Sequence, residues 1–273
     1  MNTLECRMVE VLADLRENHN VNGVKAEFEA EGTRLEEALR LKEVVAAAGL
    51  GLTIKIGGCE AIRDMYECRV IGVARIVAPM IETAYALKKY AQAVQLSFPQ
   101  DEREHVHFAV NVETETGFNN FDAMLALPES KLIDGIVLGR VDLTGSMGLS
   151  RADINTSPRV LEIARELFTK AKARGLETAL GGGVSAETIP FIQAMGTGLV
   201  DRYETRKVIF KCPGGCPVED ADKGILKAVG FELMWLKNKR DFYGLIANED
   251  AKRLEMLQSR YDKLIHAAGG VYE

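Results

Sequence analysis

The sequence predicts an α/β protein of the TIM-type (β/α) barrel class, followed by a C-terminal helical extension. Short runs rich in Val, Ile and Leu alternate with amphipathic stretches, which is typical of βα units around a parallel sheet. The 273 residues suit a single barrel, which usually needs about 250. After position 217 only helical patterns follow. We therefore expect a barrel over residues 1–217 and a helical extension over residues 218–273.

Seven strands are expected in chain order. They are "GVKAEFEA" from Gly23, "LTIKI" from Leu52, "ARIVAP" from Ala74, "HFAVNVE" from His107, "DGIVLG" from Asp134, "ETALGGG" from Glu177 and "GLVDRYETRKVIF" from Gly198. Helices are expected between them, for example over 33–49 and 158–175, each ending at a glycine as helix C-termini prefer. A closed barrel needs an eighth strand. Either it is short and near the N-terminus, where the barrel is modified, or an N-terminal helix fills the gap.

The pattern of the extension predicts two helices with no strand between them. The second has Asn248 as a plausible N-cap, and its apolar face includes Leu254, Leu257 and Leu264. An apolar face appended to a closed barrel must be buried somewhere. We expect these helices to make a homo-oligomer, and the alternative is that they fold back on the same barrel.

Composition narrows the class of partner. Hydrophobic residues make up 47% of the chain, charged residues 27%, and the net charge is −6. An acidic balance argues against a nucleic acid or an anionic membrane as the partner. No apolar run approaches the ~18 residues of a membrane span, and the N-terminus does not resemble a signal peptide. The five cysteines, an odd number, need not pair, so a cytoplasmic location is expected.

Two neighbouring strands end near a carboxylate. "HFAVNVE" ends at Glu113, and "DGIVLGRVD" ends at Asp142. The carboxyl ends of barrel strands form the mouth where the active site lies, so these two side chains can converge. Two carboxylates with water suit a hard divalent ion, Mg²⁺ or Mn²⁺. The alternative is that each acid only stabilises the start of the next helix.

Three stretches together resemble the HpcH/HpaI aldolase and citrate lyase β-subunit family. They are "VAPMIETAYALKKY", "NVETETGFNNFDAML" and "DGIVLGRVDLTGSMGL". The resemblance covers roughly residues 24–210. It implies an α/β barrel that binds pyruvate or a related 2-oxo acid on a divalent metal. It also places the family's two metal ligands on Glu113 and Asp142, whereas the other "IET", at 81–83, looks like a helix start.

The resemblance also implies roles for residues near the first two strands. Lys55 aligns with the basic residue that holds the oxygens of the 2-oxo acid. The family's catalytic histidine has no counterpart, because the matching stretch is "AEFEAEGTR". Proton transfer would then fall to Glu29, Glu31 or a metal-bound water, if burial raises the pKa of the carboxyl group. Alternatively, these acids only position Lys55 through ion pairs.

Further polar residues are expected at the mouth. Arg140 stands where the family usually has proline, and its guanidinium could clamp a carboxylate or phosphate. Glu204 and Arg206 lie near the end of the last expected strand. Each arginine is either a substrate contact or a solvated rim residue.

The stretch "LGGGVSAETIP" is a candidate anion site. Gly181, Gly182 and Gly183 end a strand, and Ser185 begins a helix. Backbone N–H groups at a helix N-terminus bind anions such as phosphate. The structural alternative is a tight strand-to-helix turn capped by Ser185.

The leading functional hypothesis is a metal-dependent carbon–carbon lyase or aldolase that acts on a pyruvate-like 2-oxo acid through a metal-stabilised enolate, with a small anionic substrate. A second hypothesis keeps the barrel and the metal but assigns a phosphorylated or enolpyruvyl-type substrate, with hydrolysis, isomerisation or C–O/P–O chemistry. A third is a non-catalytic assembly subunit.

Overall fold

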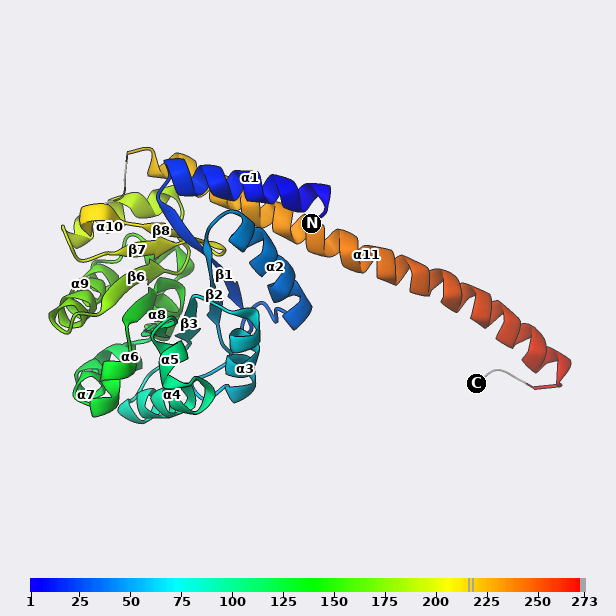
Figure 1. The fold of residues 1–273 in the computed structure, drawn as a ribbon, viewed down its shortest axis with the longest axis horizontal. Helices are drawn as coiled ribbons and strands as arrows, with labels where there is room; N and C mark the ends of the chain where they lie inside the picture. The colour runs from blue at the N-terminus through cyan, green and yellow to red at the C-terminus, as the bar shows by residue number, and fades with distance from the viewer. Residues whose placement is uncertain (216, 218, 271–273) are drawn as a thin grey trace. The chain divides into compact units, whose positions relative to one another are not determined.

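The computed structural model describes residues 1–215, 217 and 219–270. Eight strands close into a barrel in chain order, and helices surround it (Figure 1). The strands are β1 (Val21–Glu27), β2 (Gly51–Lys55), β3 (Arg75–Ala78), β4 (His107–Asn111), β5 (Gly135–Gly139), β6 (Glu177–Gly181), β7 (Arg202–Glu204) and β8 (Val208–Lys211). The TIM-like α/β fold expected from the sequence is confirmed.

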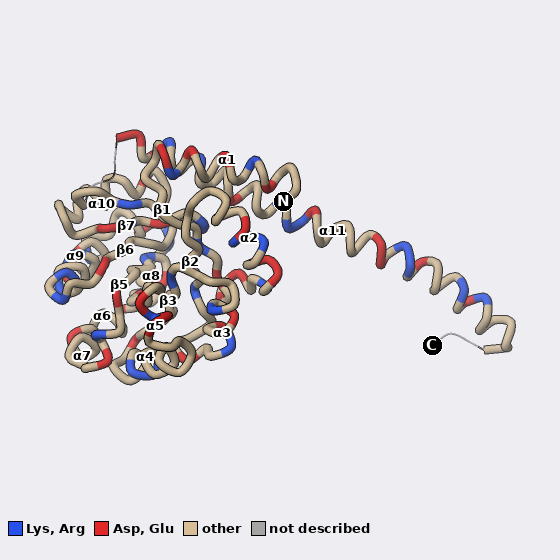
Figure 2. The backbone as a smooth tube through the Cα atoms, viewed as in Figure 1, with Lys and Arg blue, Asp and Glu red and all other residues tan. Residues whose placement is uncertain are grey.

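Helices connect the strands through β7. The α-helices are α1 (Thr3–Asn18), α2 (Leu35–Ala47), α3 (Ile62–Ile71), α4 (Ala84–Ser97), α5 (Gln100–Arg103), α6 (Glu115–Asn119), α7 (Phe121–Leu125), α8 (Arg140–Ser146), α9 (Pro158–Ala173), α10 (Ile189–Met195) and α11 (Ala221–Ala267), with 3-10 turns at Pro128–Leu132, Arg151–Ile154, Ala186–Thr188 and Pro213–Gly215. Acidic and basic residues are interspersed along them (Figure 2). None of the helices described is long and apolar enough to cross a bilayer.

The eighth strand is not where the sequence analysis placed it. The stretch expected as one strand from Gly198 divides into β7 and β8, which run antiparallel to each other. β8 also pairs antiparallel with β1 and so closes the barrel. The modification therefore lies at the end of the barrel sequence and not near the N-terminus, where α1 instead packs against α2 and β1.

Alternate residues of each strand face the barrel interior, because successive side chains of a strand point to opposite faces. Val77, Ala109, Val137 and Ala179 form an apolar cluster there, contributed by four neighbouring strands. Two positions further along these strands, at the carboxyl ends, lie Pro79, Asn111, Gly139 and Gly181. Two positions earlier, at the amino ends, lie Arg75, His107, Gly135 and Glu177. The interior is thus apolar in the middle and polar at both ends.

The amino end of the barrel holds a cluster of charges around Glu177. Arg75 Nη2 lies 2.7 Å and His107 Nε2 lies 2.9 Å from Glu177 Oε2, and Arg202 pairs with the other oxygen. Burial alone would raise the pKa of Glu177, but the His107 hydrogen bond and the two arginine charges lower the pKa to about 2. This cluster joins the first residues of four strands, so it stabilises the closed barrel.

Replacing Glu177 with Gln is expected to lower the free energy of unfolding by about 2–4 kcal/mol at pH 7, because two buried arginines lose their counter-charge. The folded-state pKa is depressed, so this stabilisation is present above the ordinary pKa of 4.5 and is lost as pH falls from there towards about 2. Urea denaturation of both proteins at pH 7 and pH 3 measures the difference. An equal difference at the two pH values would contradict the assignment.

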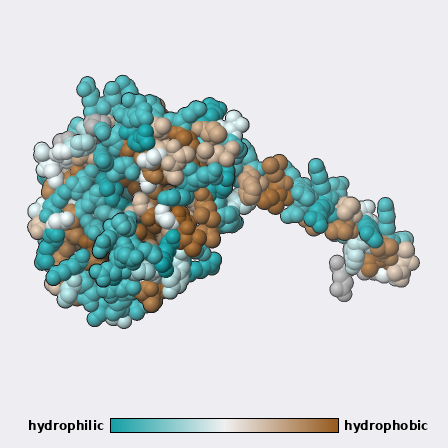
Figure 3. Space-filling model, in the orientation of Figure 1, coloured by the Kyte–Doolittle hydropathy of each residue, from teal (hydrophilic) through white to brown (hydrophobic). Residues whose placement is uncertain are grey.

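The chain divides into two compact units, Met1–Glu232 and Leu233–Glu273. The prediction of two C-terminal helices is wrong, because α11 runs without a break from Ala221 to Ala267. Asn248 therefore lies inside a helix and caps none. A glycine or asparagine in a helix interior costs only about 1 kcal/mol, which neighbouring helix-forming residues offset. Apolar patches are visible along this helix (Figure 3).

Candidate active site

A cavity of about 410 Å³ lies at the carboxyl ends of the barrel strands. Its walls come from the ends of β1, β2, β4, β5, β6 and β7, from residues beyond them, and from Val229 and Glu232 of α11. This is the face on which TIM-barrel enzymes carry their active sites. The cavity brings together nine of the site residues expected from the sequence, namely Glu29, Lys55, Glu113, Asp142, Gly181, Gly182, Gly183, Glu204 and Arg206.

Glu113 lies two residues beyond β4 and is only 2% exposed. Its carboxylate accepts hydrogen bonds from the Met80 backbone N–H at 3.0 Å and from Asn111 Nδ2 at 2.7 Å. Burial raises the pKa of Glu113, and the nearby Lys55 charge offsets part of that increase. Gly139 on the neighbouring strand leaves room for it, because a Cβ at that position would lie 2.3 Å from Glu113 Oε2. The carboxylate is therefore held in one orientation.

Asp142 lies in the first turn of α8, directly after β5, and is exposed to the cavity. β4 and β5 are neighbours in the barrel, so Glu113 and Asp142 share one cavity, as the sequence predicts. Asp142 also occupies a helix start, where an acid is stabilised by the helix dipole. The two explanations offered for this acid are thus compatible.

Lys55 and Glu29 form the opposite part of the wall. Lys55 Nζ lies 3.2 Å from Glu29 Oε2 and 3.8 Å from Glu113 Oε1. The ammonium group therefore sits between the two carboxylates, and its side chain is only 10% exposed. The ion pair between Glu29 and Lys55 is the one that the sequence analysis held open as an alternative to a catalytic role for Glu29.

Glu31 does not line the cavity, contrary to expectation. Its carboxylate pairs with Lys207 and with Arg206, the latter at 3.2 Å. Burial would raise the pKa of Glu31, but these two cations lower it below its ordinary value. A base active near neutral pH needs the opposite shift. Glu31 is therefore a structural ion-pair partner.

Arg140 is fully buried and does not line the cavity, so the predicted substrate clamp is wrong. Its guanidinium donates to Gly181 O at 3.2 Å, to Gly182 O at 3.0 Å and to Asn155 Oδ1 at 2.7 Å. The Phe191 ring lies 4.9 Å away. Burial lowers the pKa of Arg140 to about 10, which leaves the side chain charged at neutral pH. Arg140 thus stabilises the glycine loop by hydrogen bonds to its carbonyl groups.

The glycine loop lines the cavity with its backbone. Gly182 has a φ of +76°, and a Cβ there would lie 2.5 Å from the Arg140 backbone nitrogen. Only glycine fits such a turn and such an approach. Ser185 does not line the cavity; its backbone N–H donates to Thr188 Oγ1 at 3.1 Å. The loop is therefore the tight turn of the structural alternative, and its anion-binding role stays a prediction.

Glu204 and Arg206 lie at the cavity but are engaged by neighbouring charges. Lys25 Nζ lies 2.5 Å from Glu204 Oε1 and 3.4 Å from Glu27 Oε1. Burial would lower the pKa of Lys25, but Glu204 and Glu27 raise it. Arg206 is half-exposed and pairs with Glu27 at 3.4 Å. These residues form a charged wall built by β1 and β7.

The residues of the cavity wall that the sequence analysis missed include Lys25, Asn111 and Arg151. Lys25 alternates with Glu27 along β1, and Asn111 stands two positions before Glu113. This period of two along a strand places them on the interior face. Arg151, in contrast, follows α8 in a short 3-10 turn, and no strand pattern could have indicated it.

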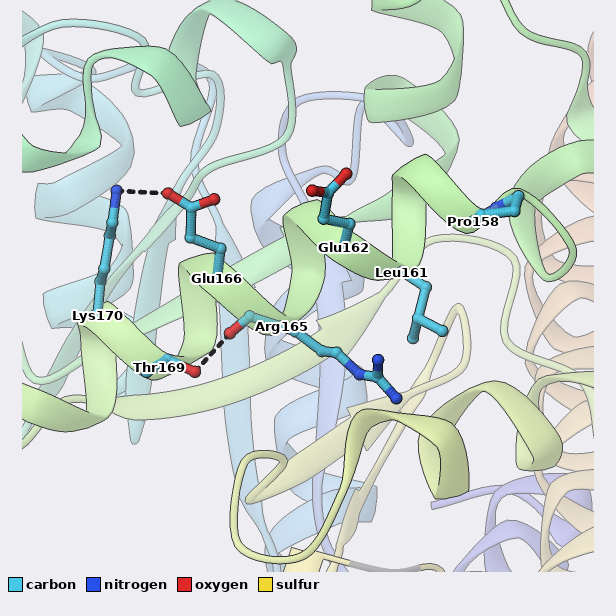
Figure 4. Close-up of a pocket in the computed structure, with 7 residues that line it drawn as sticks. All are labelled: Pro158, Leu161, Glu162, Arg165, Glu166, Thr169 and Lys170. Carbon is cyan, nitrogen blue, oxygen red and sulfur yellow. Dashed lines mark hydrogen bonds and ion pairs between the residues drawn. The ribbon is translucent and has the colours of Figure 1, made fainter.

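A larger hollow of about 600 Å³ lies along the outer face of α9. All seven residues that line it belong to this one helix (Figure 4). Its charged side chains already have partners within the protein. Lys170 pairs with Glu166 at 2.8 Å, and Arg165 Nε donates to the Ala194 carbonyl at 3.0 Å. A groove on one helix with self-paired charges offers no convergent chemical groups. The candidate site is therefore the cavity at the barrel mouth.

Comparison with known proteins agrees with this fold. A protein-family model described as HpcH/HpaI aldolase/citrate lyase matches residues 35–186, which is more than half of the chain. A search of curated proteins found no significant match.

Solved structures share the fold. A HpcH/HpaI aldolase/citrate lyase family protein from Burkholderia cenocepacia J2315 is 17% identical, with a TM-score of 0.57 over 68% of this chain and 80% of that one. A HpcH/HpaI aldolase from Desulfitobacterium hafniense DCB-2 is 14% identical, with a TM-score of 0.55 over 69% and 79%. The citrate synthase SbnG is 17% identical, with a TM-score of 0.58 over 86% and 90%. Identities this low show a common fold.

The family match indicates a lyase- or aldolase-type enzyme with this barrel fold. The chain belongs to the HpcH/HpaI aldolase/citrate lyase family. This family typically uses a divalent metal ion.

The cavity can be tested for its fit to such an ion. Among the described residues no three His, Cys, Asp or Glu side chains cluster as metal ligands, so protein carboxylates would supply two ligands, Glu113 and Asp142. Asn111, whose amide group contacts Glu113, also lines the cavity, and its buried Oδ1 has no hydrogen-bond partner within the described part of the chain. All three are hard oxygen donors, which Mg²⁺ and Mn²⁺ prefer, and both ions commonly retain water ligands. The donor set fits.

Proposed function

We propose that this protein is a divalent-metal-dependent carbon–carbon lyase or aldolase that acts on a pyruvate-like 2-oxo acid. The charge balance of the cavity carries the proposal. Four basic and six acidic side chains line the cavity. A single divalent cation would neutralise this excess of two negative charges. Without a cation, an acidic cavity of this kind would repel the anionic substrates on which this type of enzyme acts.

Glu113 and Asp142 would hold the ion, and Asn111 Oδ1 offers a third oxygen. A divalent ion supplies Lewis-acid stabilisation of the negative charge that develops on the 2-oxo acid when a C–C bond forms or breaks. Lys55, buried between Glu29 and Glu113, would bind the substrate carboxylate as a point charge. Because two carboxylates already hold its ammonium group, Lys55 is oriented before the substrate arrives.

Proton transfer is assigned to Glu29. The family's histidine is absent, and Glu31 is occupied by Lys207 and Arg206. Glu29 lines the cavity, is partly exposed, and contacts Lys55 at 3.2 Å. It can therefore reach a substrate that Lys55 binds, and it can exchange protons with solvent.

We assign to Arg151 the role that was expected of Arg140, namely binding a distal anionic group of the substrate. Lys25, Lys55 and Arg206 are each paired with a carboxylate. For Arg151 the structure describes no ion pair among residues 1–215, 217 and 219–270. It is exposed, lines the cavity and can contact an anionic group at the far end of the substrate.

The alternative, a phosphorylated or enolpyruvyl-type substrate, has less support. It relied on Arg140 and on the glycine loop together. Arg140 is buried behind that loop, and its guanidinium N–H groups donate to acceptors within the protein. A phosphate would add two negative charges to a cavity that is already acidic. A small 2-oxo acid suits the cavity better.

Metal-stripped protein is expected to bind Mn²⁺ with micromolar affinity, and oxalate is expected to tighten that binding. Oxalate has the shape and charge of the pyruvate enolate, so it should bind where that charge is stabilised. Isothermal titration with Mn²⁺, then with oxalate on the loaded protein, measures both. Binding of Mn²⁺ with no response to oxalate would argue against a 2-oxo acid, and absence of Mn²⁺ binding would refute the metal site.

A further inference from the structure

The part of α11 in the second unit carries a row of side chains that nothing in the proposed reaction uses, and all of them except the partly buried Tyr243 are exposed. The row, called the seam below, consists of Leu233, Leu236, Arg240, Tyr243, Ala247, Asp250, Leu254 and Leu257. The four leucines are 51–68% exposed. Exposed leucines in a row are uncommon on a monomer surface and mark an interaction site.

The spacing of the seam is that of a coiled coil. Its members are three and four residues apart in strict alternation, which is the a/d pattern of a heptad repeat. Tyr261 and Leu264 continue the same spacing towards the C-terminus. A seam with this period packs against another helix along its length, with side chains of one helix fitting between those of the other.

The order of the residues along the seam is self-complementary when one helix is reversed. Each apolar member has an apolar counterpart at the same distance on the other side of Leu245. Leu233 corresponds to Leu257, and Leu236 to Leu254. Tyr243 corresponds to Ala247, a large residue facing a small one.

The two charged members obey the same symmetry. Arg240 and Asp250 are also equidistant from Leu245 and are opposite in sign. Among the residues that the structure describes, Arg240 pairs with its neighbour Asp241 at 3.0 Å, with side chains 75% and 61% exposed. Such an exposed pair contributes little, so Arg240 can exchange it for a partner across an interface.

We propose that residues 233–257 form an antiparallel two-stranded coiled coil with the same segment of a second copy of this chain. In this dimer Arg240 of each copy pairs with Asp250 of the other, and the two-fold axis crosses the seam at the level of Leu245, between Tyr243 and Ala247. A charge within a coiled-coil seam sets orientation and register, because only one alignment pairs it. A parallel pair would place Arg240 against Arg240 and Asp250 against Asp250, and both contacts are repulsive.

Gly244 is an independent observation that favours a close neighbour here. A glycine inside a helix is about 1 kcal/mol less favourable than alanine. Within the described residues, a Cβ added at Gly244 would meet no atom within 4 Å, so nothing in the single chain requires glycine. In the antiparallel dimer Gly244 of both copies lies beside the two-fold axis, flanked by Ala247 and Ala251. Small residues there let two helices approach closely.

Charge reversal tests the dimer and its orientation together. The proteins to compare are wild type, Arg240→Asp, Asp250→Arg and the double variant, with Glu255→Arg, on the outer face of the helix, as the control. Light scattering after size exclusion gives their masses. The wild type is expected to be an even multiple of the 30.0 kDa chain. Each single variant is expected to have half the wild-type mass, and the double variant and Glu255→Arg are expected to retain it.

A single-chain mass for the wild type would overturn the proposal and would favour a face that folds back or binds a different protein. Single variants with the wild-type mass, or a double variant that stays dissociated, would overturn it as well. Mn²⁺ binding measured on the same samples belongs to the barrel cavity and is expected to be equal in all of them. Failure of the dimer and failure of the metal site are therefore distinguishable.

Cross-linking gives the orientation directly. With a short bismaleimide reagent, Ile246→Cys is expected to yield a cross-linked dimer, because Ile246 lies beside its own copy at the two-fold axis. Leu257→Cys is expected to yield no more than wild type, since its two copies would lie about 36 Å apart at 1.5 Å per residue. The wild type measures the background from native cysteines. The reverse result would mean a parallel pair, and no cross-link from either would refute the interface.

Discussion

Replacing Asp142 with Asn is expected to lower the affinity for Mn²⁺ at least about 100-fold, because loss of even an outer partner of a metal ligand reduces affinity by about 10- to 100-fold. An amide keeps the shape of the side chain but removes the charge that a divalent ion requires. Asp142 is exposed at the start of α8, so the free energy of unfolding should change by no more than about 1 kcal/mol. Titration calorimetry and thermal unfolding measure the two effects.

Asp122→Asn is the matched control for this experiment. Asp122 is also an exposed acid in the first turn of a helix, α7, but it lies outside the cavity. The Asp122→Asn variant should bind Mn²⁺ with the affinity of the wild type. If Asp142→Asn and Asp122→Asn both retained wild-type affinity, Asp142 would be a helix-start acid and no ligand.

Replacing Arg140 with Met is expected to destabilise the fold by about 3–5 kcal/mol, as removal of one partner from a buried charged network usually does. The carbonyls of Gly181 and Gly182 and the amide oxygen of Asn155 would be left buried without their donor. At about 2–4 °C per kcal/mol for a domain of this size, the melting temperature should fall by about 6–20 °C. Thermal unfolding followed by circular dichroism measures the change.

Two further variants help to interpret the stability of Arg140→Met. Arg140→Lys keeps the charge but loses the fork of donors, so it should lie between Met and the wild type. Arg151→Met removes an exposed arginine of the same cavity region and should change stability by less than about 0.5 kcal/mol. A melting temperature for Arg140→Met within 2 °C of wild type would show that the loop does not depend on this guanidinium.

Most of the barrel was predictable because its signals are local. The alternation of apolar runs with amphipathic stretches indicates strands and helices, and parallel order then follows from their sequence. The eighth strand escaped prediction because β7 and β8 are short and are joined by a turn of three residues. Their residues look like one long strand until the chain reverses.

The candidate site was predictable in part for the same reason. Glu113 and Asp142 follow neighbouring strands, so their meeting in one cavity depends only on strand order and on the alternation of side chains. Asn111 obeys the same alternation and could have been found by it. The ion pairs of Glu31 and Glu204 could not be found in this way, because they join β1 and the loop after it to the β7–β8 region across 175 or more positions of sequence.

By itself, the sequence determined most of the strand segments and the meeting of Glu113 and Asp142 in one cavity at the barrel mouth. These properties depend on the period of apolar residues and on the order of elements. Only the tertiary structure decided the direction of Arg140, the pairing of Lys25 with Glu204, and the place of Arg151 in the cavity wall. A side chain turns to whichever partner best satisfies its charge at close range, and that partner is brought near only when the barrel closes.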